Sequence, residues 1–497
     1  MAKRIIAVIM AAITVASVFT ACSTSGTGET TTAPAVVEKE AVIQQDDSTF
    51  KLSYTQSDSL NPLEAVTLNN QILAQLVFES LFDLDDNFKA SLNIASSYEY
   101  TDSQTLEVGI ISGLKFSDGS LLTASDVRDS FNKAKESAYW GAQLADIKSC
   151  SVKSESEIVF KLERANQYAH NLLNFPIVSS EDSTYPVGNG RYYFADENGE
   201  PVLKANVTDN FNPYITTIHL ENIAAEDSID NAVNIGNISF AFRDLSSNTS
   251  RKMSANKKLV NMNNLVFMGV NNKSGITTNA EIRKAISLAI NRNTLVKSAY
   301  GNFAQPATGV FNPQFELSQS ELFEREADIN AAKQAVTKSG VSNLSLSILV
   351  NSSNTERLTC AKLIKQQLEE AGFSVSITEE SDNNRYYDMI QKEQFSLYIG
   401  EIKLSPDMSL YPFFDENGTA HFGIDTNTSQ TAALYNSYIE GQEELGSFLI
   451  SFSDEMPFIP LLYRKGMICF TKAMNGNVEG TLNDCFINIE NWYFESE

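Results

Sequence analysis

The chain has 497 residues, of which 42% are hydrophobic and 20% charged, and its formal net charge is −25 at pH 7. A chain of this length is too long for one hydrophobic core, so it predicts two or three domains. The excess of acidic residues argues against binding to nucleic acid and against lying flat on an anionic membrane.

The N-terminal segment, residues 1–22, has the features of a secretory signal peptide. Two basic residues open it, the apolar run 5–19 follows, and small residues precede Cys22. The run is short for a membrane span, and the absence of a following basic cluster disfavours a stop-transfer anchor. The polar and small residues that come next cannot build a core, so we expect a flexible tether over residues 23–49.

The globular part begins with a pattern of strand, turn and helix. Phe50, Leu52 and Tyr54 alternate with polar residues, which predicts a half-buried strand. A turn follows at residues 60–62. Residues 69–81 then carry apolar side chains at helical spacing and predict a helix.

Residues 113–131, with the sequence GLKFSDGSLLTASDVRDSF, predict a short strand at 114–116, a turn and a helix. Asp118 and Gly119 suit the turn, because Asp bonds its own backbone and Gly accepts a positive φ. Thr123 offers a hydroxyl group as the N-cap of the helix. Two apolar side chains four residues apart share one face of that helix, namely Val127 and Phe131.

The second half of the chain contains the clearest helix, over residues 281–300, with Thr278 or Asn279 as its cap. Residues 344–377 read as strand, helix and strand, which predicts two parallel strands with a right-handed crossover. The helix of this unit is expected at 359–371 and stops at Gly372. The strands expected from alternating or continuous apolar residues are 98–112, 158–162, 344–350, 373–377 and 395–399 (ending at Gly400).

Four motifs follow one another along the chain: FESLF at 78–82 with Glu79, the stretch 115–127, PVGNGRY at 186–192 and IRKAISLAINR at 282–292. They resemble motifs of family 5 of the extracellular solute-binding proteins, the peptide- and nickel-binding components of ABC importers. Two of them depart from the family pattern, because Asn189 and Arg191 replace Thr and Pro, and Asn291 replaces Asp. The run 457–463 also resembles a strand of this family, and Cys22 with the residues before it resembles a bacterial lipobox.

The resemblance implies an α/β fold of the two-lobed periplasmic-binding-protein-like kind (class II type), in which the first lobe is enlarged by an inserted subdomain. The lobes are expected to close on the ligand like a hinge. The implied divisions are lobe I at 50–64, 186–251 and 469–497, the inserted subdomain at 65–185, and lobe II at 252–468.

The implied function is that of a substrate-binding lipoprotein that delivers a peptide or peptide-like solute to the permease and ATPase subunits of an ABC importer. It would be a monomer, without a cofactor or enzymatic activity, and would be anchored through lipid on Cys22 to the outer face of the cell membrane. Two other roles remain open: a surface receptor for a signalling peptide, and a binder of a metal chelate or another small solute.

Peptide-binding relatives add the ligand as a β-strand to an edge in each lobe. The resemblance places one edge at Thr55, Gln56 and Ser57. It places the other at residues 400–407, where Glu401 replaces the Trp of the family. The acidic residue that pairs with the peptide amine in relatives is missing from its usual place. Glu401 or Asp407 is a candidate to replace it, and the alternative for both is a solvated loop charge. The candidate ligand-binding residues are Thr55, Gln56, Ser57, Trp140, Gly400, Glu401, Ile402, Lys403 and Asp407, with core packing as the alternative role of Trp140.

Enzymatic and metal-binding alternatives have weaker support. Ser130 with Lys133, the triplet 338–340 and the triplet 381–383 imitate the motifs of penicillin-binding serine hydrolases. Their order along the chain is wrong, and Ser130 lies deep in a predicted helix. No two of the three histidines, His170, His219 and His421, have metal-ligand spacing, although His421 could contact a ligand such as a nickel chelate.

Four cysteines remain if Cys22 carries lipid, and none has CxxC spacing. They allow three disulfide pairings, and buried free thiols are the alternative. These cysteines are Cys150, Cys360, Cys469 and Cys485.

Overall fold

A computed structural model describes residues 50–180, 183–245, 253–318 and 322–494. The predicted signal peptide, the predicted lipidation site Cys22 and the predicted tether lie outside the described residues. The same is true of residues 246–251, at the end of one predicted segment of lobe I. Among the helices of the described residues, none has both the length and the apolar character needed to cross a membrane.

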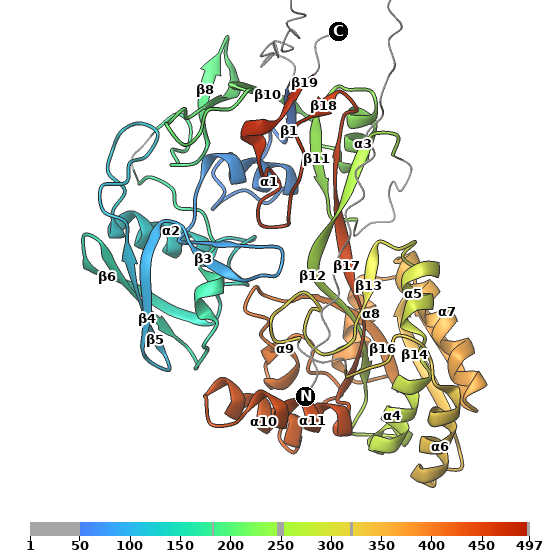
Figure 1. The fold of residues 1–497 in the computed structure, drawn as a ribbon. Helices are drawn as coiled ribbons and strands as arrows, with labels where there is room; N and C mark the ends of the chain where they lie inside the picture. The colour runs from blue at the N-terminus through green and yellow to red at the C-terminus, as the bar shows by residue number, and fades with distance from the viewer. Residues whose placement is uncertain (1–49, 181–182, 246–252, 319–321, 495–497) are drawn as a thin grey trace, which may run out of the picture. The chain divides into compact units, whose positions relative to one another are not determined.

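Within the described residues, eleven strands form one mixed sheet (Figure 1). Their order is β15-β14-β16-β12-β17-β11-β1-β10-β9-β8, and β13 pairs with β17 outside this path. The strands are β1 Lys51–Tyr54, β8 Tyr192–Glu197, β9 Glu200–Ala205, β10 Thr217–Asn222, β11 Phe240–Arg243, β12 Asn256–Val270, β13 Ala304–Pro306, β14 Ser345–Asn351, β15 Ser374–Glu380, β16 Leu397–Lys403 and β17 Phe458–Phe470.

The two longest strands, β12 and β17, connect the two ends of this sheet. They pair antiparallel with each other, with register shifts between Asn261 and Leu265 and between Val266 and Phe267. One end of β17 pairs with β11, next to β1, whereas the opposite end of β12 pairs with β16, next to β14. β12 and β17 therefore join the strands at one end of the sheet to the strands at the other end.

Three smaller sheets lie outside the large one. The four-stranded sheet β4-β5-β7-β6 packs against helix α2, where the ring of Phe131 meets that of Phe160 with 5.6 Å between centroids. The strands of the small sheets are β2 Phe82–Leu84, β3 Ala90–Leu92, β4 Ala95–Asp102, β5 Thr105–Ile110, β6 Ile147–Ser154, β7 Glu157–Leu162, β18 Met474–Asn475 and β19 Tyr493–Phe494.

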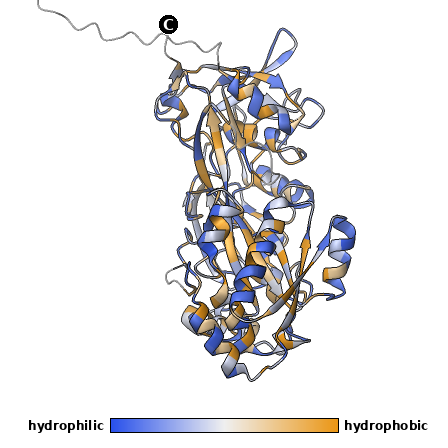
Figure 2. Ribbon diagram, turned by 90° about the vertical axis from the view of Figure 1, so that its right-hand side faces the viewer, coloured by the Kyte–Doolittle hydropathy of each residue, from blue (hydrophilic) through white to orange (hydrophobic). Residues whose placement is uncertain are grey.

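The helices are mostly amphipathic, as the alternation of blue and orange along their ribbons shows (Figure 2). Short 3₁₀ helices occur at Ala169–Leu172, Ile276–Thr278 and Ile489–Asn491. The α-helices of the described residues are α1 Leu68–Val77, α2 Ala124–Glu136, α3 Glu226–Asn234, α4 Ala280–Ala289, α5 Arg292–Ser298, α6 Ile329–Ser339, α7 Thr355–Glu370, α8 Asn383–Gln391, α9 Tyr411–Phe414, α10 Gln430–Ile439 and α11 Leu445–Glu455.

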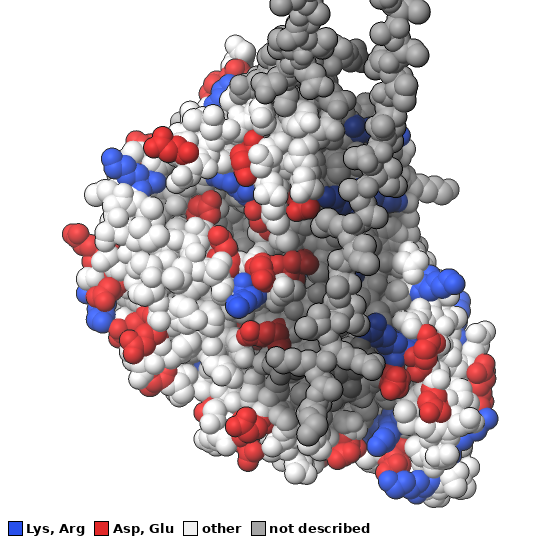
Figure 3. Space-filling view, viewed as in Figure 1, with Lys and Arg blue, Asp and Glu red and all other residues white. Residues whose placement is uncertain are grey.

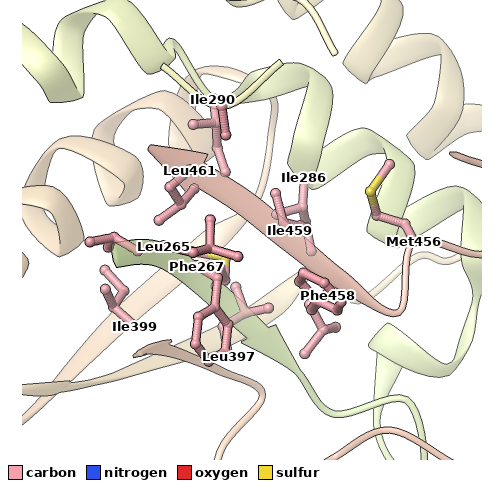
Figure 4. Packing of buried hydrophobic residues seen from close by; sticks show 14 of the residues in the cluster. Leu265, Phe267, Ile286, Ile290, Leu397, Ile399, Met456, Phe458, Ile459 and Leu461 are labelled. Atoms are coloured by element: carbon pink, nitrogen blue, oxygen red, sulfur yellow. The ribbon is translucent and has the colours of Figure 1, made fainter. Parts of the chain in front are cut away.

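The buried apolar side chains separate into two large clusters. One surrounds β12, β14, β16 and β17 and contains Phe267, Leu397 and Phe458, which pack together in Figure 4. The other surrounds β1, α1, α2 and the four-stranded sheet, and it contains Phe50 and Trp492. The division of the core into two clusters agrees with the expectation that one core would not suffice for this length.

The stretch 113–131 folds largely as predicted. The Asp118 carboxylate accepts hydrogen bonds from the N–H and hydroxyl of Ser120, and Gly119 has a φ of 90°. Helix α2 begins after Thr123, whose N–H and hydroxyl both donate to the Asp126 carboxylate. The strand predicted at 114–116 was wrong, because only an isolated bridge between Lys115 and Leu121 forms there.

The helix predicted at 69–81 ends four residues early, at Val77. Phe78 is extended, and the Val77 carbonyl accepts a hydrogen bond from the Gly190 N–H at 2.9 Å. A Cβ on Gly190 would lie 2.6 Å from the Val77 carbonyl carbon, so this turn needs glycine. A tertiary contact that helical spacing cannot reveal therefore coincides with the end of α1.

The helix predicted at 281–300 is interrupted. The Asn279 cap is confirmed, since its side chain accepts from the Glu281 N–H. Ile290 is extended, however, and the Asn291 side chain caps the second helix, α5, by accepting from the Thr294 N–H. Asn competes for backbone hydrogen bonds in this way, which favours caps over helix interiors.

The unit of strand, helix and strand at 344–377 is confirmed, because β14 and β15 pair in parallel. Helix α7 begins four residues before the predicted start, since the Asn354 side chain caps it. Gly372 follows the helix with a φ of 101°. The strands predicted at 395–399 and 457–463 are both longer, because β16 continues along β12 to Lys403 and β17 continues along β11 and β12 to Phe470.

Candidate solute-binding site

The first predicted ligand edge, Thr55 to Ser57, is a turn directly after β1. The Thr55 N–H donates to the Asn70 side chain at 2.8 Å, and the Gln56 N–H donates to the Asn222 side chain at 3.1 Å. Gln56 and Ser57 are exposed, and Ser57 has no hydrogen-bond partner among the described residues. Two of the three N–H groups expected to bind a ligand strand are thus already used within the chain.

A hollow of about 410 Å³ lies beside this turn. Asn222, which holds Gln56, is one of its lining residues. The other lining residues come from the segment after β10, from α3 and from the turn after α3, and they include Ser228 and Asn231. The lining mixes small apolar and polar side chains, and the sequence contained no motif that pointed to it.

The second predicted edge lies on β16. On one side, this strand pairs with β12 along its whole length, from Leu397 to Lys403. On the other side, the ladder to β14 contains only Leu397 and Tyr398. Residues 400–403 consequently have no strand partner on that side among the described residues, which is the geometry required for adding an extended ligand.

Gly400 has a packing role at this position. It faces Phe267 across the β12–β16 ladder, and a Cβ on Gly400 would lie 2.6 Å from the Phe267 ring. Tyr398 and Gly269 repeat the arrangement two residues away, with the aromatic ring on the other strand. Each glycine leaves room for the ring opposite it.

Glu401 is bound within the protein. Its carboxylate accepts from the Arg464 guanidinium at 2.6 Å and from the Asn264 amide at 3.1 Å. Arg464 also donates to the backbone carbonyl of Asp244 at 2.8 Å, and only 4% of its side chain is exposed. Arg464 on β17 therefore links β16 to the segment after β11, and these two elements lie towards opposite ends of the large sheet.

Asp407 is also engaged within the protein. It is buried, and its carboxylate accepts from the Asn166 amide at 2.7 Å, from the Ser409 N–H at 3.2 Å and from the Ser405 hydroxyl. Burial raises the pKa of this carboxyl group, against the effect of these hydrogen bonds. Nearby, Arg164 bridges Asp146 and Asp415, so residues of the predicted inserted subdomain contact the segment after β16 at two places.

Lys403 and the pair Tyr139-Trp140 meet at the end of β16. The Lys403 ammonium lies 5.7 Å from the centre of the Tyr139 ring, and this ring meets the Trp140 ring edge to face. The Trp140 indole N–H donates to the Pro62 carbonyl at 3.2 Å. Trp140 is thus half-buried and held by the backbone, while Tyr139 faces the lysine.

The structure brings together only some of the predicted residues. Glu401 and Lys403 project from the same face of β16, as expected for alternate strand residues, and Gly400 and Ile402 project from the other. No hydrogen bond or ion pair between described residues joins 55–57 to 400–407. Arg464, Asn166 and Asn264 were missed, and no motif or local spacing marked them because each acts from a distant segment.

A cluster of charged side chains surrounds Glu79, the acidic residue of the FESLF motif. The Asn93 amide donates to both Glu79 and Asp83, at 2.7 and 2.9 Å. Burial, opposed by the Asn93 hydrogen bond and reinforced by nearby Asp83, raises the pKa of Glu79 to about 7. Arg191 donates to Asp484 at 2.7 Å beside them, so the residue that departs from the family motif takes part in this cluster.

The serine-hydrolase alternative finds no support at Ser130. Its hydroxyl is buried in α2 and exchanges hydrogen bonds with the backbone of Val178, donating to the carbonyl and accepting from the N–H. Asp382 of the 381–383 triplet caps α8. Ser130 and Asp382 therefore have structural roles where they lie.

The described part of the chain contains no cluster of three or more His, Cys, Asp or Glu side chains that could hold a metal ion. His170 stacks on Tyr98, and burial lowers its pKa to about 4. The four described cysteines are free thiols, three of them buried and Cys150 half-buried. On the face shown in Figure 3, acidic and basic side chains are interspersed over the described surface.

Comparison with known proteins identifies the family. The sequence model for the bacterial extracellular solute-binding proteins, family 5 Middle, matches residues 89–421. The chain belongs to this family. The matched range contains the stretch 113–131 and the end of β16, so the predicted resemblance is confirmed.

Individual relatives are distant. The glutathione-binding protein GsiB of Escherichia coli is 25% identical over 349 residues, which cover 64% of this chain and 67% of that protein. A solved ABC transporter substrate-binding protein, CtaP of Listeria monocytogenes, is 18% identical with a TM-score of 0.71, covering 90% of this chain and 99% of that one. NikA of Staphylococcus aureus, solved with Ni(L-His)2, is 17% identical with a TM-score of 0.59 and covers 90% and 99%.

The solved structures cover nearly all of the described chain, and they establish its fold class. The fold is α/β, of the two-lobed periplasmic-binding-protein kind. The long strands β12 and β17 are the elements that both ends of its large sheet share.

Proposed function

We propose that this solute-binding protein captures a peptide or peptide-like solute between its two lobes and delivers it to the permease and ATPase subunits of an ABC importer. The observation that carries the proposal is the open edge of β16 at residues 400–403, because an extended ligand can complete the strand pairing there. The proposed ligand-binding residues are those predicted from the sequence, on β16 and in the turn after β1.

The proposed division into lobes follows the same boundaries as the sequence expectation: lobe I at 50–64, 186–251 and 469–497, the inserted subdomain at 65–185 and lobe II at 252–468. The two large apolar clusters support it, since one lies around β1 and α2 and the other around β14 and β16. The shared strands β12 and β17 would carry the hinge. Ligand would shift the population towards the closed form through contacts that both lobes make.

Binding is tested with purified protein. Native mass spectrometry should detect a retained solute, and scattering should show compaction when a peptide from a mixed library binds. A retained nickel chelate would favour the second candidate role instead. If no solute is retained and no peptide binds, the proposed function is wrong.

The protein is further proposed to act as a monomer on the outer face of the cell membrane, held by lipid on Cys22 and without catalytic activity. The lipobox-like residues before Cys22 support this anchor. Cys22→Ala should release the protein from the membrane fraction into the medium or periplasm. Unchanged retention of this variant in membranes would contradict the anchor without affecting the binding proposal.

A further inference from the structure

The end of β16 presents a cation where peptide-binding relatives are expected to present an acid. The two carboxylates that could replace the missing acid are both engaged. Glu401 accepts from Arg464 and Asn264, and Asp407 accepts from Asn166 and Ser409 and is buried. The charge of Glu401 is already compensated by Arg464, and Asp407 would have to become accessible before it could pair with a ligand amine.

Lys403 is differently placed. Its side chain is exposed, and no carboxylate of the described residues lies within ion-pair distance of its ammonium. Its contact is the face of the Tyr139 ring, at 5.7 Å. A cation over an aromatic face keeps its hydrogen-bond donors available, because the ring interacts through its electrostatic field and accepts no directed bond.

Charged groups of neighbouring elements also act on Lys403, namely Asp244 and Arg464. Desolvation by the surrounding protein lowers the pKa of the ammonium, while its side chain remains exposed and can meet a ligand.

We propose that Lys403, backed by the Tyr139 ring at the open end of β16, binds a carboxylate of the solute and makes this protein selective for an acidic ligand group. This inference rests on the proposed function and deepens it. The ligand strand would then lie along residues 400–403 with an acidic end, and not a free amine, at Lys403. The carboxylate can come from a peptide C-terminus or from an acidic side chain.

The test measures affinities by titration calorimetry with four probes, namely trialanine, N-acetyl-trialanine, trialanine amide and Ala-Glu-Ala amide. We expect N-acetyl-trialanine to bind and trialanine amide to bind roughly ten- to a hundred-fold more weakly. Lys403→Met should weaken N-acetyl-trialanine to the level of the amide and leave the amide unchanged. If Ala-Glu-Ala amide binds tightly instead and loses affinity in Lys403→Met, the bound carboxylate is that of a side chain.

Lys392→Met is the matched control, because Lys392 directly follows α8, is exposed and pairs with Asp388 of that helix. It should leave all four affinities unchanged, and thermal unfolding should confirm that both variants fold. The inference is overturned if the probes bind but trialanine amide binds as tightly as the acids, or if Lys403→Met has no effect.

The failure of the proposed function would be distinct. It requires that none of the probes binds and that the purified protein retains no solute. If the probes fail but a solute is retained, mass spectrometry decides: an anionic solute lost in Lys403→Met supports the inference, and a solute without an anionic group overturns it.

Discussion

Two stretches of this chain, residues 113–131 and 400–407, differ in where their polar side chains find partners. In the first, Asp126 accepts from Thr123 and Asp118 accepts from Ser120, within three residues. In the second, Glu401 accepts from Arg464 on another strand, and Asp407 accepts from Asn166 in a distant segment. Hydrogen bonds between residues close in the chain can be predicted from the sequence. Partners from distant segments, which cannot, decide whether a side chain remains available for a ligand.

The largest effect should follow from Glu401→Ala. Arg464 is almost fully buried, so removing its partner leaves a buried charge with fewer bonds and should cost about 3 kcal/mol of unfolding free energy. Urea denaturation measures the loss. The control is Glu107→Ala, which removes an exposed pair with Lys153 and should cost less than about 0.5 kcal/mol. Equal losses of unfolding free energy in the two variants would show that the pair of Glu401 and Arg464 stabilises the fold no more than an exposed ion pair does.

The next effect concerns Gly400. Gly400→Ala places a methyl group 2.6 Å from the Phe267 ring, and overpacking of this kind should cost about 2 kcal/mol. Gly446→Ala is the control, because no atom lies within 4 Å of its Cβ position and it lies in α11. That change should be neutral or slightly stabilising. Denaturation midpoints that fall equally in both variants would contradict the packing role.

A smaller effect is expected in the locally determined stretch. Thr123→Ala removes the hydroxyl that donates to Asp126 at the start of α2 and should cost about 1 kcal/mol. Thr123→Ser should recover most of the loss, since it keeps the hydroxyl. Thermal unfolding followed by circular dichroism compares the two variants, and a serine variant as unstable as the alanine variant would argue against a capping role.

The last prediction is a pH dependence at Glu79, which lies in a sequence motif but has partners from outside it. Its pKa in the folded protein is about 7, above its ordinary value of 4.5, so the folded state binds more protons between these values. The stabilising contribution is therefore fully present below about pH 4.5 and is lost as the pH rises through 7. Relative to Glu79→Gln, the unmodified protein should lose roughly 2 °C of melting temperature between pH 5 and pH 8. Parallel pH profiles for the two proteins would contradict the shifted pKa.

The sequence by itself determined the family, the turn and capped helix at 113–131, and the parallel unit at 344–377. Each of these depends on residues close in the chain, on alternation or on helical spacing. The local structure that such patterns predict is also found in the folded protein. Even there, the end of α1 and the break after Ile290 were missed, because a backbone contact from Gly190 and a cap by Asn291 override the spacing.

The tertiary structure alone decided which charges at the end of β16 are available. Glu401 and Asp407 looked like the substitutes for a missing acid, but Arg464 and Asn166 engage them from segments that no local pattern connects. Lys403 is left facing Tyr139. The physical reason is that the binding capacity of a charged side chain depends on the partners that folding brings to it, and these partners cannot be read from its neighbours in the sequence.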